Sequence, residues 1–94
     1  MRNLVLTSSF KRAFKRLVRR QPELEQRIEE RLAILTVDPF DPLLQTHKLK
    51  GKLSGAWACS VEYDCRIVFN FVENPDSGEE DIVLIDIGTH DEVY

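Results

Sequence analysis

The sequence predicts a single α+β domain over residues 1–94, with the order β-α-α-β-β-β and a helical hairpin packed on an antiparallel-rich sheet. Three observations support this fold class. Apolar side chains recur at helical spacing in the first part of the chain, and they alternate at strand spacing after Trp57. The length of 94 residues, with 43% hydrophobic and 31% charged, fits one small domain with a thin core. Any functional site is therefore expected to be an open groove.

The first part of the chain predicts a strand followed by two helices. Residues 3–7 form a short β-rich run, after which Ser8 or Ser9 can cap a helix. Pro22 ends that helix and suits the first turn of the next, which stops at the Asp-Pro pairs of residues 38–42. The two apolar stripes consist of Phe10, Ala13, Phe14, Leu17 and Val18, and then Leu24, Ile28, Leu32 and Leu35.

The second part of the chain predicts three strands. Apolar and small or polar residues alternate over residues 57–63, and Asp64 is a plausible residue for a tight turn. Residues 66–72 continue as a second strand. Residues 74–81 read as a solvated turn, and residues 82–87 are apolar enough to lie in the middle of a sheet.

Charge is distributed unevenly along the chain, whose net charge is -3. Residues 1–22 contain seven Lys or Arg and no acid, whereas residues 67–94 contain eight Asp or Glu and no Lys or Arg. The six cations of residues 11–20 form either a solvated helix face or a surface for an acidic partner. The acids of residues 73–81 fall in a predicted loop that is expected to point away from any polyanion.

Cysteine usage and hydropathy point to an intracellular protein. Cys59 and Cys65 have neither disulfide-scaffold nor CxxC spacing, so we expect reduced, structural thiols and no metal or other cofactor. The apolar stretches fall short of the ~20 residues that span a bilayer, and no signal peptide is visible. We therefore expect a cytoplasmic protein without a membrane partner.

Several polar residues are candidates for binding or catalysis. Lys48, Lys50 and Lys52 alternate in HKLKGKLSG and suit contacts to successive phosphates, although such a cluster also forms ordinary solvated surface. Arg66 offers a planar fork for a phosphate, or alternatively pairs with Glu62 or Asp64.

Two histidines and two aromatic residues complete the candidates. His47 and His90 are suited to moving a proton near neutral pH, or are inert surface residues. Trp57 reads as a core residue more readily than as a base-stacking platform. Tyr94 either docks on the domain or belongs to a site.

In combination these segments resemble the RelE/YafQ-like family of bacterial type II toxins. The resemblance lies in HKLKG (residues 47–51), Trp57, VEYDCRIVF (residues 61–69) and IGTHDEVY (residues 87–94), and the predicted element order is also that of the family. It implies an mRNA interferase: a metal-independent endoribonuclease that cuts mRNA in the ribosomal A site through attack by the substrate's own 2′-hydroxyl.

The resemblance also implies roles for individual residues. His47 matches a general base and His90 a general acid, and Arg66 matches the arginine that stabilises the phosphorane. Asp64 matches an acidic site residue of the YafQ branch, and Tyr94 an aromatic residue that positions a base. Lys48, Lys50 and Lys52 would anchor the RNA backbone. The implied partners are the ribosome, mRNA and a cognate antitoxin that holds the toxin in a heteromeric complex.

The chain also departs from the family pattern. Ser60 and Cys65 stand where the YafQ branch carries a further histidine and a tryptophan, so the acid and base assignment stays open. Two alternatives remain: a non-catalytic inhibitor of DNA gyrase, like the ParE branch, and a degenerate toxin kept as an antitoxin-binding module. The joint presence of His47, Arg66 and His90 favours the endoribonuclease.

Overall fold

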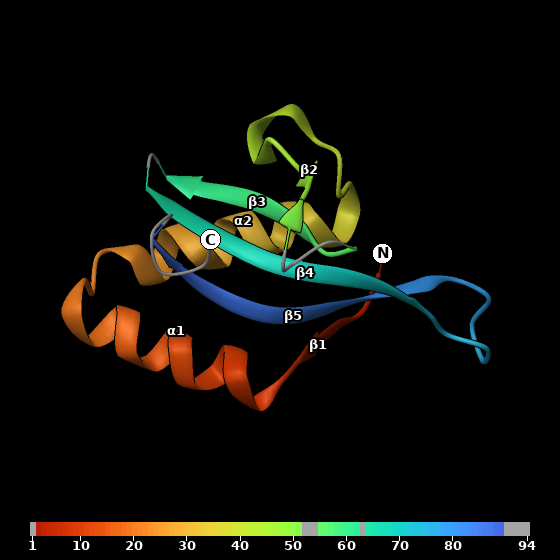
Figure 1. The fold of residues 1–94 in the computed structure, drawn as a ribbon, viewed down its shortest axis with the longest axis horizontal. Coiled ribbons are helices and arrows are strands. Elements are labelled where there is room, and N and C mark those ends of the chain that lie inside the picture. The colour runs from red at the N-terminus through yellow and green to blue at the C-terminus, as the bar shows by residue number, and fades with distance from the viewer. Residues whose placement is uncertain (1, 52–54, 63, 90–94) are drawn as a thin grey trace.

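Five strands form one mixed sheet with two helices against one face in this computed structural model (Figure 1). The structure describes residues 2–51, 55–62 and 64–89. In chain order the elements are β1 (Leu4–Leu6), α1 (Ser8–Arg20), α2 (Leu24–Val37), the 3₁₀ turn η1 (Pro42–Leu44), β2 (His47–Lys48), β3 (Trp57–Glu62), β4 (Cys65–Glu73) and β5 (Glu80–Thr89).

The sheet has the strand order β1-β5-β4-β3-β2. Strand β1 runs parallel to β5, and the other neighbours are antiparallel. The predicted α+β class is confirmed, and β5 lies inside the sheet as its apolar sequence indicated. The predicted order lacked one strand, β2, which forms at the start of the lysine segment HKLKGKLSG. It pairs with β3 because the neighbouring Leu49 is buried and its amide donates to the carbonyl of Ala56 at 2.9 Å.

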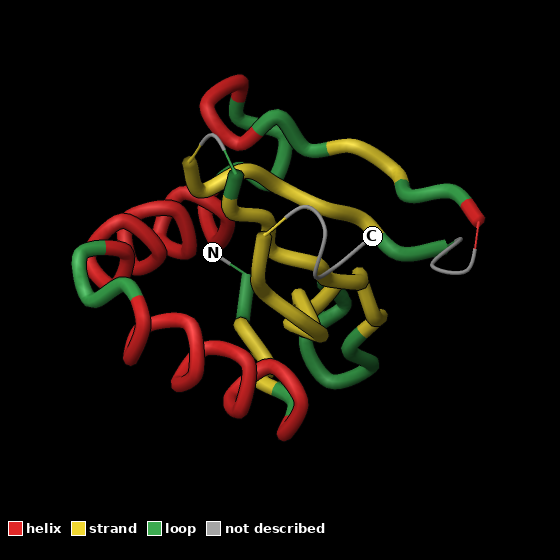
Figure 2. Tube along the Cα trace, turned by 60° about the vertical axis from the view of Figure 1, so that its left-hand side comes forward, coloured by secondary structure: helices red, strands yellow, loops and turns green. Residues whose placement is uncertain are grey.

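The two helices contribute the predicted apolar stripes to one core. Figure 2 shows both helices on the same side of the strands. Helix α1 packs mainly against β5, and α2 mainly against β3. Buried residues of both helices meet the side chains of β3, β4 and β5 that point to this side, among them Cys59, Ile67 and Phe69. The core therefore lies between the helices and the sheet.

The N-cap of α1 differs from the prediction. Thr7, rather than Ser8 or Ser9, caps the helix, because its hydroxyl oxygen accepts from the amide of Phe10 at 3.1 Å. The same hydroxyl donates to the carbonyl of Leu84 at 2.8 Å. Thr7 therefore fixes the start of α1 to strand β5.

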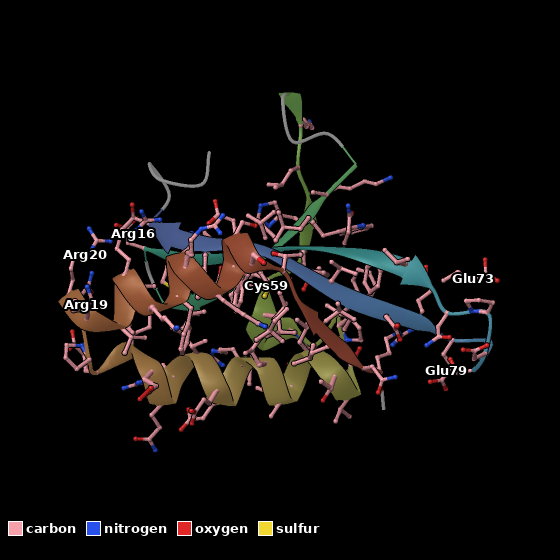
Figure 3. All side chains as sticks on the ribbon, turned by 90° about the horizontal axis from the view of Figure 1, so that it is seen from below. Arg16, Arg19, Arg20, Cys59, Glu73 and Glu79 are labelled. Carbon is pink, nitrogen blue, oxygen red and sulfur yellow. The ribbon has the colours of Figure 1, made fainter. Side chains whose placement is uncertain are left out.

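The opposite face of the sheet carries no helix among the described elements. A smaller apolar cluster of Leu49, Ala56, Ala58, Val68 and the half-buried Ile85 lies there. Figure 3 shows this side uppermost, with β2 and its connections rising from it, α2 below the sheet and α1 in front of the strands. We call this side of the sheet the open face. In the described part of the chain no helix is long and apolar enough to cross a membrane.

Candidate functional site

Strand alternation places Arg66 on the open face. Its neighbours Cys65 and Ile67 point into the core, so the side chain of Arg66 lies on the other side of β4. Across the sheet Arg66 pairs with Ser60 on β3 and Gly88 on β5. Gly88 has no side chain, so nothing on that strand crowds the guanidinium from its paired position.

The guanidinium of Arg66 is held against the end of the β3–β4 hairpin. Its Nη1 donates to the carbonyl oxygens of Glu62 at 3.1 Å and Cys65 at 3.3 Å. The carboxylate of Glu62 lies 3.3 Å from Nε of Arg27 on α2. Arg66 is half-buried, and these contacts restrain a charge that faces the open side of the sheet.

His47 lies on the same face, two strands away. It pairs with Ala58, which in turn pairs with Val68, the residue two positions after Arg66. Two strand spacings of about 4.8 Å and a two-residue step of about 6.8 Å put the Cα atoms of His47 and Arg66 about 12 Å apart. The open face therefore carries both a titratable imidazole and a fixed cation.

Gln45 orients the imidazole of His47. The Nδ1 atom of His47 lies 3.0 Å from the carbonyl oxygen of Gln45, which cannot donate, so Nδ1 carries the hydrogen and Nε2 of the neutral ring is a base. Gln45 has φ of 50°, in the left-handed region, and its side-chain oxygen accepts from the hydroxyl of Ser60 at 3.2 Å. Sequence reasoning missed Gln45, because only its backbone carbonyl serves the histidine.

The lysine segment does not form a single row beside His47. Lys48 pairs with Trp57 and its Nζ lies 5.6 Å from the centre of the Trp57 ring. Since Trp57 packs against the helix-side core, Lys48 points away from the face that carries His47. Lys50 is exposed, and Lys52 lies outside the described residues.

Of the remaining candidates, the structure describes only Asp64, which lies at one end of the sheet. Asp64 is exposed in the turn between β3 and β4, at a pocket of about 70 Å³ that is also lined by Gln21 and Thr89. Thr89 is the last described residue of β5 and pairs with Cys65. His90 and Tyr94 lie outside the described residues.

Asp86 is a further charged residue on the open face that sequence reasoning did not select. It pairs with Val68 and so continues the row of His47, Ala58 and Val68 onto β5. Its Oδ1 accepts from the amide of Ile87 at 2.8 Å. A single acid within the apolar run IVLIDIG was the signal in the sequence.

The two cysteines are buried in the core as thiols and do not form a disulfide, as the sequence indicated. Burial, together with repulsion from Cys65, raises the pKa of Cys59 to about 12. A thiol with such a pKa is not a nucleophile at neutral pH. Within the described residues no group of three His, Cys, Asp or Glu side chains is placed to hold a metal ion.

The chain falls in a class of small proteins, the toxins of type II toxin-antitoxin systems. Over residues 2–94 the chain matches the family model described as the bacterial toxin of the type II toxin-antitoxin system, YafQ. The chain therefore belongs to the YafQ toxin family, as its motifs indicated. No curated protein matches it.

Solved structures show the same fold. A copper-bound variant of a toxin from Helicobacter pylori is 28% identical, with a TM-score of 0.74 and full coverage of both chains. YafQ from E. coli is 14% identical, with a TM-score of 0.79 over 100% of this chain and 99% of the other. A YoeB/ParE toxin from Agrobacterium tumefaciens is 22% identical, with a TM-score of 0.75 over 94% and 98%. At these last two identities the likeness concerns the fold alone.

Proposed function

We propose that this toxin is a ribosome-dependent endoribonuclease that cleaves mRNA, with residues 1–94 acting as one toxin domain in the cytoplasm. The observation that carries the proposal is the shared placement of His47 and Arg66 on the open face of the sheet. One supplies a base and the other a fixed positive charge, which are two of the groups that phosphodiester cleavage needs.

The proposed reaction uses the 2′-hydroxyl of the substrate. Nε2 of His47 takes the 2′-hydroxyl proton while the 2′-oxygen bonds to the adjacent phosphorus. Arg66 stabilises the charge on the phosphorane, because its guanidinium is already oriented and needs no rearrangement. The bond to the 5′-oxygen then breaks, and that oxygen receives a proton from His90. The products are a 2′,3′-cyclic phosphate and a free 5′-hydroxyl.

The other candidates take supporting roles in this proposal. Tyr94 stacks on a base of the RNA. Asp64 acts at the end of the sheet, beside Thr89 at the end of β5. Lys50 and Lys52 bind the RNA backbone. Lys48 contributes its charge from the far side of β2, where it lies over Trp57.

A cognate antitoxin is the proposed partner, in a heteromeric complex. The E. coli DinJ-YafQ toxin-antitoxin complex has the same toxin fold, with a TM-score of 0.76 at 15% identity. The basic face of α1 is a suitable surface for an acidic segment, because the first turn of the helix contains no acid and its last turn contains Arg19 and Arg20. Such a partner would neutralise the basic side of the toxin and block access to the open face.

One experiment tests the enzymatic proposal directly. The toxin is induced alone in a bacterium, and 5′ ends are mapped on translated and untranslated copies of the same message. We expect cuts confined to the translated copy, and none with His47→Ala or Arg66→Ala. Intact messages with gyrase-linked DNA breaks would instead support a ParE-like activity, and the absence of both would indicate a module kept only for antitoxin binding.

A further inference from the structure

A groove between α1 and β5 lies beside the open face. It has a volume of about 340 Å³ and is lined by Ser9, Arg12, Ala13, Arg16, Ile85 and Asp86. The hydroxyl of Ser9 donates to the carbonyl of Ile85 at 2.8 Å, which ties the first turn of α1 to β5. The groove is therefore held by a fixed contact between the two elements that form its walls.

The groove shares a residue, Asp86, with the open face. Asp86 ends the row that begins with His47 and crosses Ala58 and Val68 on the open face, and Asp86 also lines the groove. The register of β4 and β5 shifts between Val68 and Phe69, so Ile85 is an extra residue on β5 at this point. Such bulges bend and twist a strand. A chain that crosses the open face from β2 toward β5 reaches the groove next.

The charges of the groove favour an anion. Arg12 and Arg16 are both exposed and lie one helical turn, about 5.4 Å, apart on the same side of α1. Among the lining residues that the structure describes, Asp86 is the one carboxylate, and it already accepts a hydrogen bond from the amide of Ile87. No acid lies in the first turn of α1, whose amide ends carry partial positive charge. With two guanidinium groups and one carboxylate, the described lining has a net positive charge.

We propose that this groove is a second phosphate-binding subsite, which holds the backbone of single-stranded RNA as it leaves the open face. The inference rests on the proposed function and extends it to Arg12 and Arg16. The lining favours a phosphate backbone over an acidic peptide, because Ile85 is the one large apolar side chain among its described residues and protein interfaces depend on buried apolar or aromatic anchors. Guanidinium groups bind phosphate through paired hydrogen bonds and need no such anchor.

Helix α1 offers a matched control for the test. Lys11 and Lys15 are also exposed and one turn apart, but they do not line the groove. Two double variants are compared: one combines Arg12→Gln with Arg16→Gln, and the other combines Lys11→Gln with Lys15→Gln. Both remove the same charge from the same helix, and Gln is a good helix former. The probe is a fluorescein-labelled RNA with 2′-O-methyl groups throughout, which binds but cannot be cut, in a tetranucleotide and a dodecanucleotide form. Fluorescence anisotropy gives Kd as a function of salt.

The groove pair is expected to affect the longer probe selectively. Losing two phosphate contacts lowers the slope of log K against log salt by about 1.4, so the affinity ratio of wild type to variant shrinks about sevenfold between about 50 and 200 mM salt. The tetranucleotide, which occupies the open face alone, should bind both double variants alike. Asp86→Asn should tighten binding of the dodecanucleotide, because a repelling charge is removed.

Two results would overturn the subsite. Equal effects of the arginine and lysine pairs would show that α1 acts through its overall charge. Weakened antitoxin binding with unchanged RNA affinity in the arginine pair would assign the groove to the protein partner. Neither result contradicts the proposed endoribonuclease activity if the wild-type toxin still binds the probe and cuts translated mRNA. A wild-type toxin that neither binds the probe nor cuts translated mRNA would contradict the proposed function itself.

Discussion

Replacing Arg66 by Ala should abolish most cleavage while leaving the protein folded. If Arg66 faces the phosphorane, its removal resembles the loss of one preorganised donor, which costs ~10²- to 10³-fold in rate, or about 2.7–4 kcal/mol of transition-state stabilisation. The loss of folding stability caused by the same substitution should be smaller than this loss of transition-state stabilisation. Nη1 makes two hydrogen bonds to the carbonyls of Glu62 and Cys65, each contributing about 0.5–1.5 kcal/mol, and water replaces part of this at a half-exposed site.

Arg31 is a suitable control for this structural cost. Its Nε donates to the carbonyl of Val61 at 3.2 Å, so it also holds the end of β3, but from α2 on the opposite side of the sheet. We expect Arg31→Ala and Arg66→Ala to lower Tm by similar amounts, about 4–8 °C per kcal/mol. Cleavage should fall only in Arg66→Ala. Arg66→Lys should be intermediate, because it keeps the charge but loses the planar fork.

The assay combines single-turnover cleavage of a message on stalled ribosomes with thermal melting of each variant. The reasoning about Arg66 would be refuted if Arg66→Ala cut within about threefold of wild type, given the far larger loss expected for a phosphorane contact. Equal rate losses in Arg66→Ala and Arg31→Ala would also refute it, because the common factor would then be the stability of the β3–β4 hairpin.

Three further predictions concern the cap, the core thiol and the acidic hairpin. Thr7→Ala should lower the free energy of unfolding by about 1–2 kcal/mol, more than Ser8→Ala, in denaturant titrations; equal losses would contradict the assigned N-cap. Because burial raises the pKa of Cys59 from 9.0 to about 12, the thiol supports folding below pH 9 and this support is lost as pH rises toward 12. Cys59→Ala should therefore flatten the alkaline decline in stability by up to about 1.4 kcal/mol per pH unit, and an unchanged slope would exclude this thiol as its source. Reversing Glu79 and Glu80 to Lys should leave antitoxin affinity nearly unchanged in titration calorimetry, and loss of the complex would show that the partner docks on the acidic hairpin instead.

The sequence predicted the elements that repeat a pattern over several residues. Only a helix buries all the apolar side chains of the stripe that includes Phe10 and Leu17. Only a strand buries those of the alternating run that includes Cys59. Strand β2 is two residues long and has no such pattern. It exists because Leu49 reaches an apolar patch formed by residues 56, 58 and 68, which becomes available only after the sheet has formed.

Contacts between distant segments also decided the details that the sequence left open. Thr7, Ser8 and Ser9 all carry hydroxyl groups that can cap a helix, and the carbonyl of Leu84, 77 positions away from Thr7, selects among them. The same holds at the site. A strand over residues 66–72, as the sequence predicts, is enough to put Arg66 and Ile67 on different faces of the sheet. The orientation of His47 depends instead on the left-handed backbone of Gln45, which no residue preference indicates.

The net charge of -3 is compatible with RNA binding because the charges are separated along the molecule. Figure 3 shows Arg16, Arg19 and Arg20 at one end and Glu73 and Glu79 at the other, on the β4–β5 hairpin that projects beyond the sheet. The longest dimension of the Cα trace is 38 Å, several times the ~8 Å Debye length at physiological ionic strength. A phosphate at the α1 end is therefore largely screened from the hairpin and interacts with the local cations. The acidic hairpin therefore lowers the net charge without weakening the proposed RNA surface.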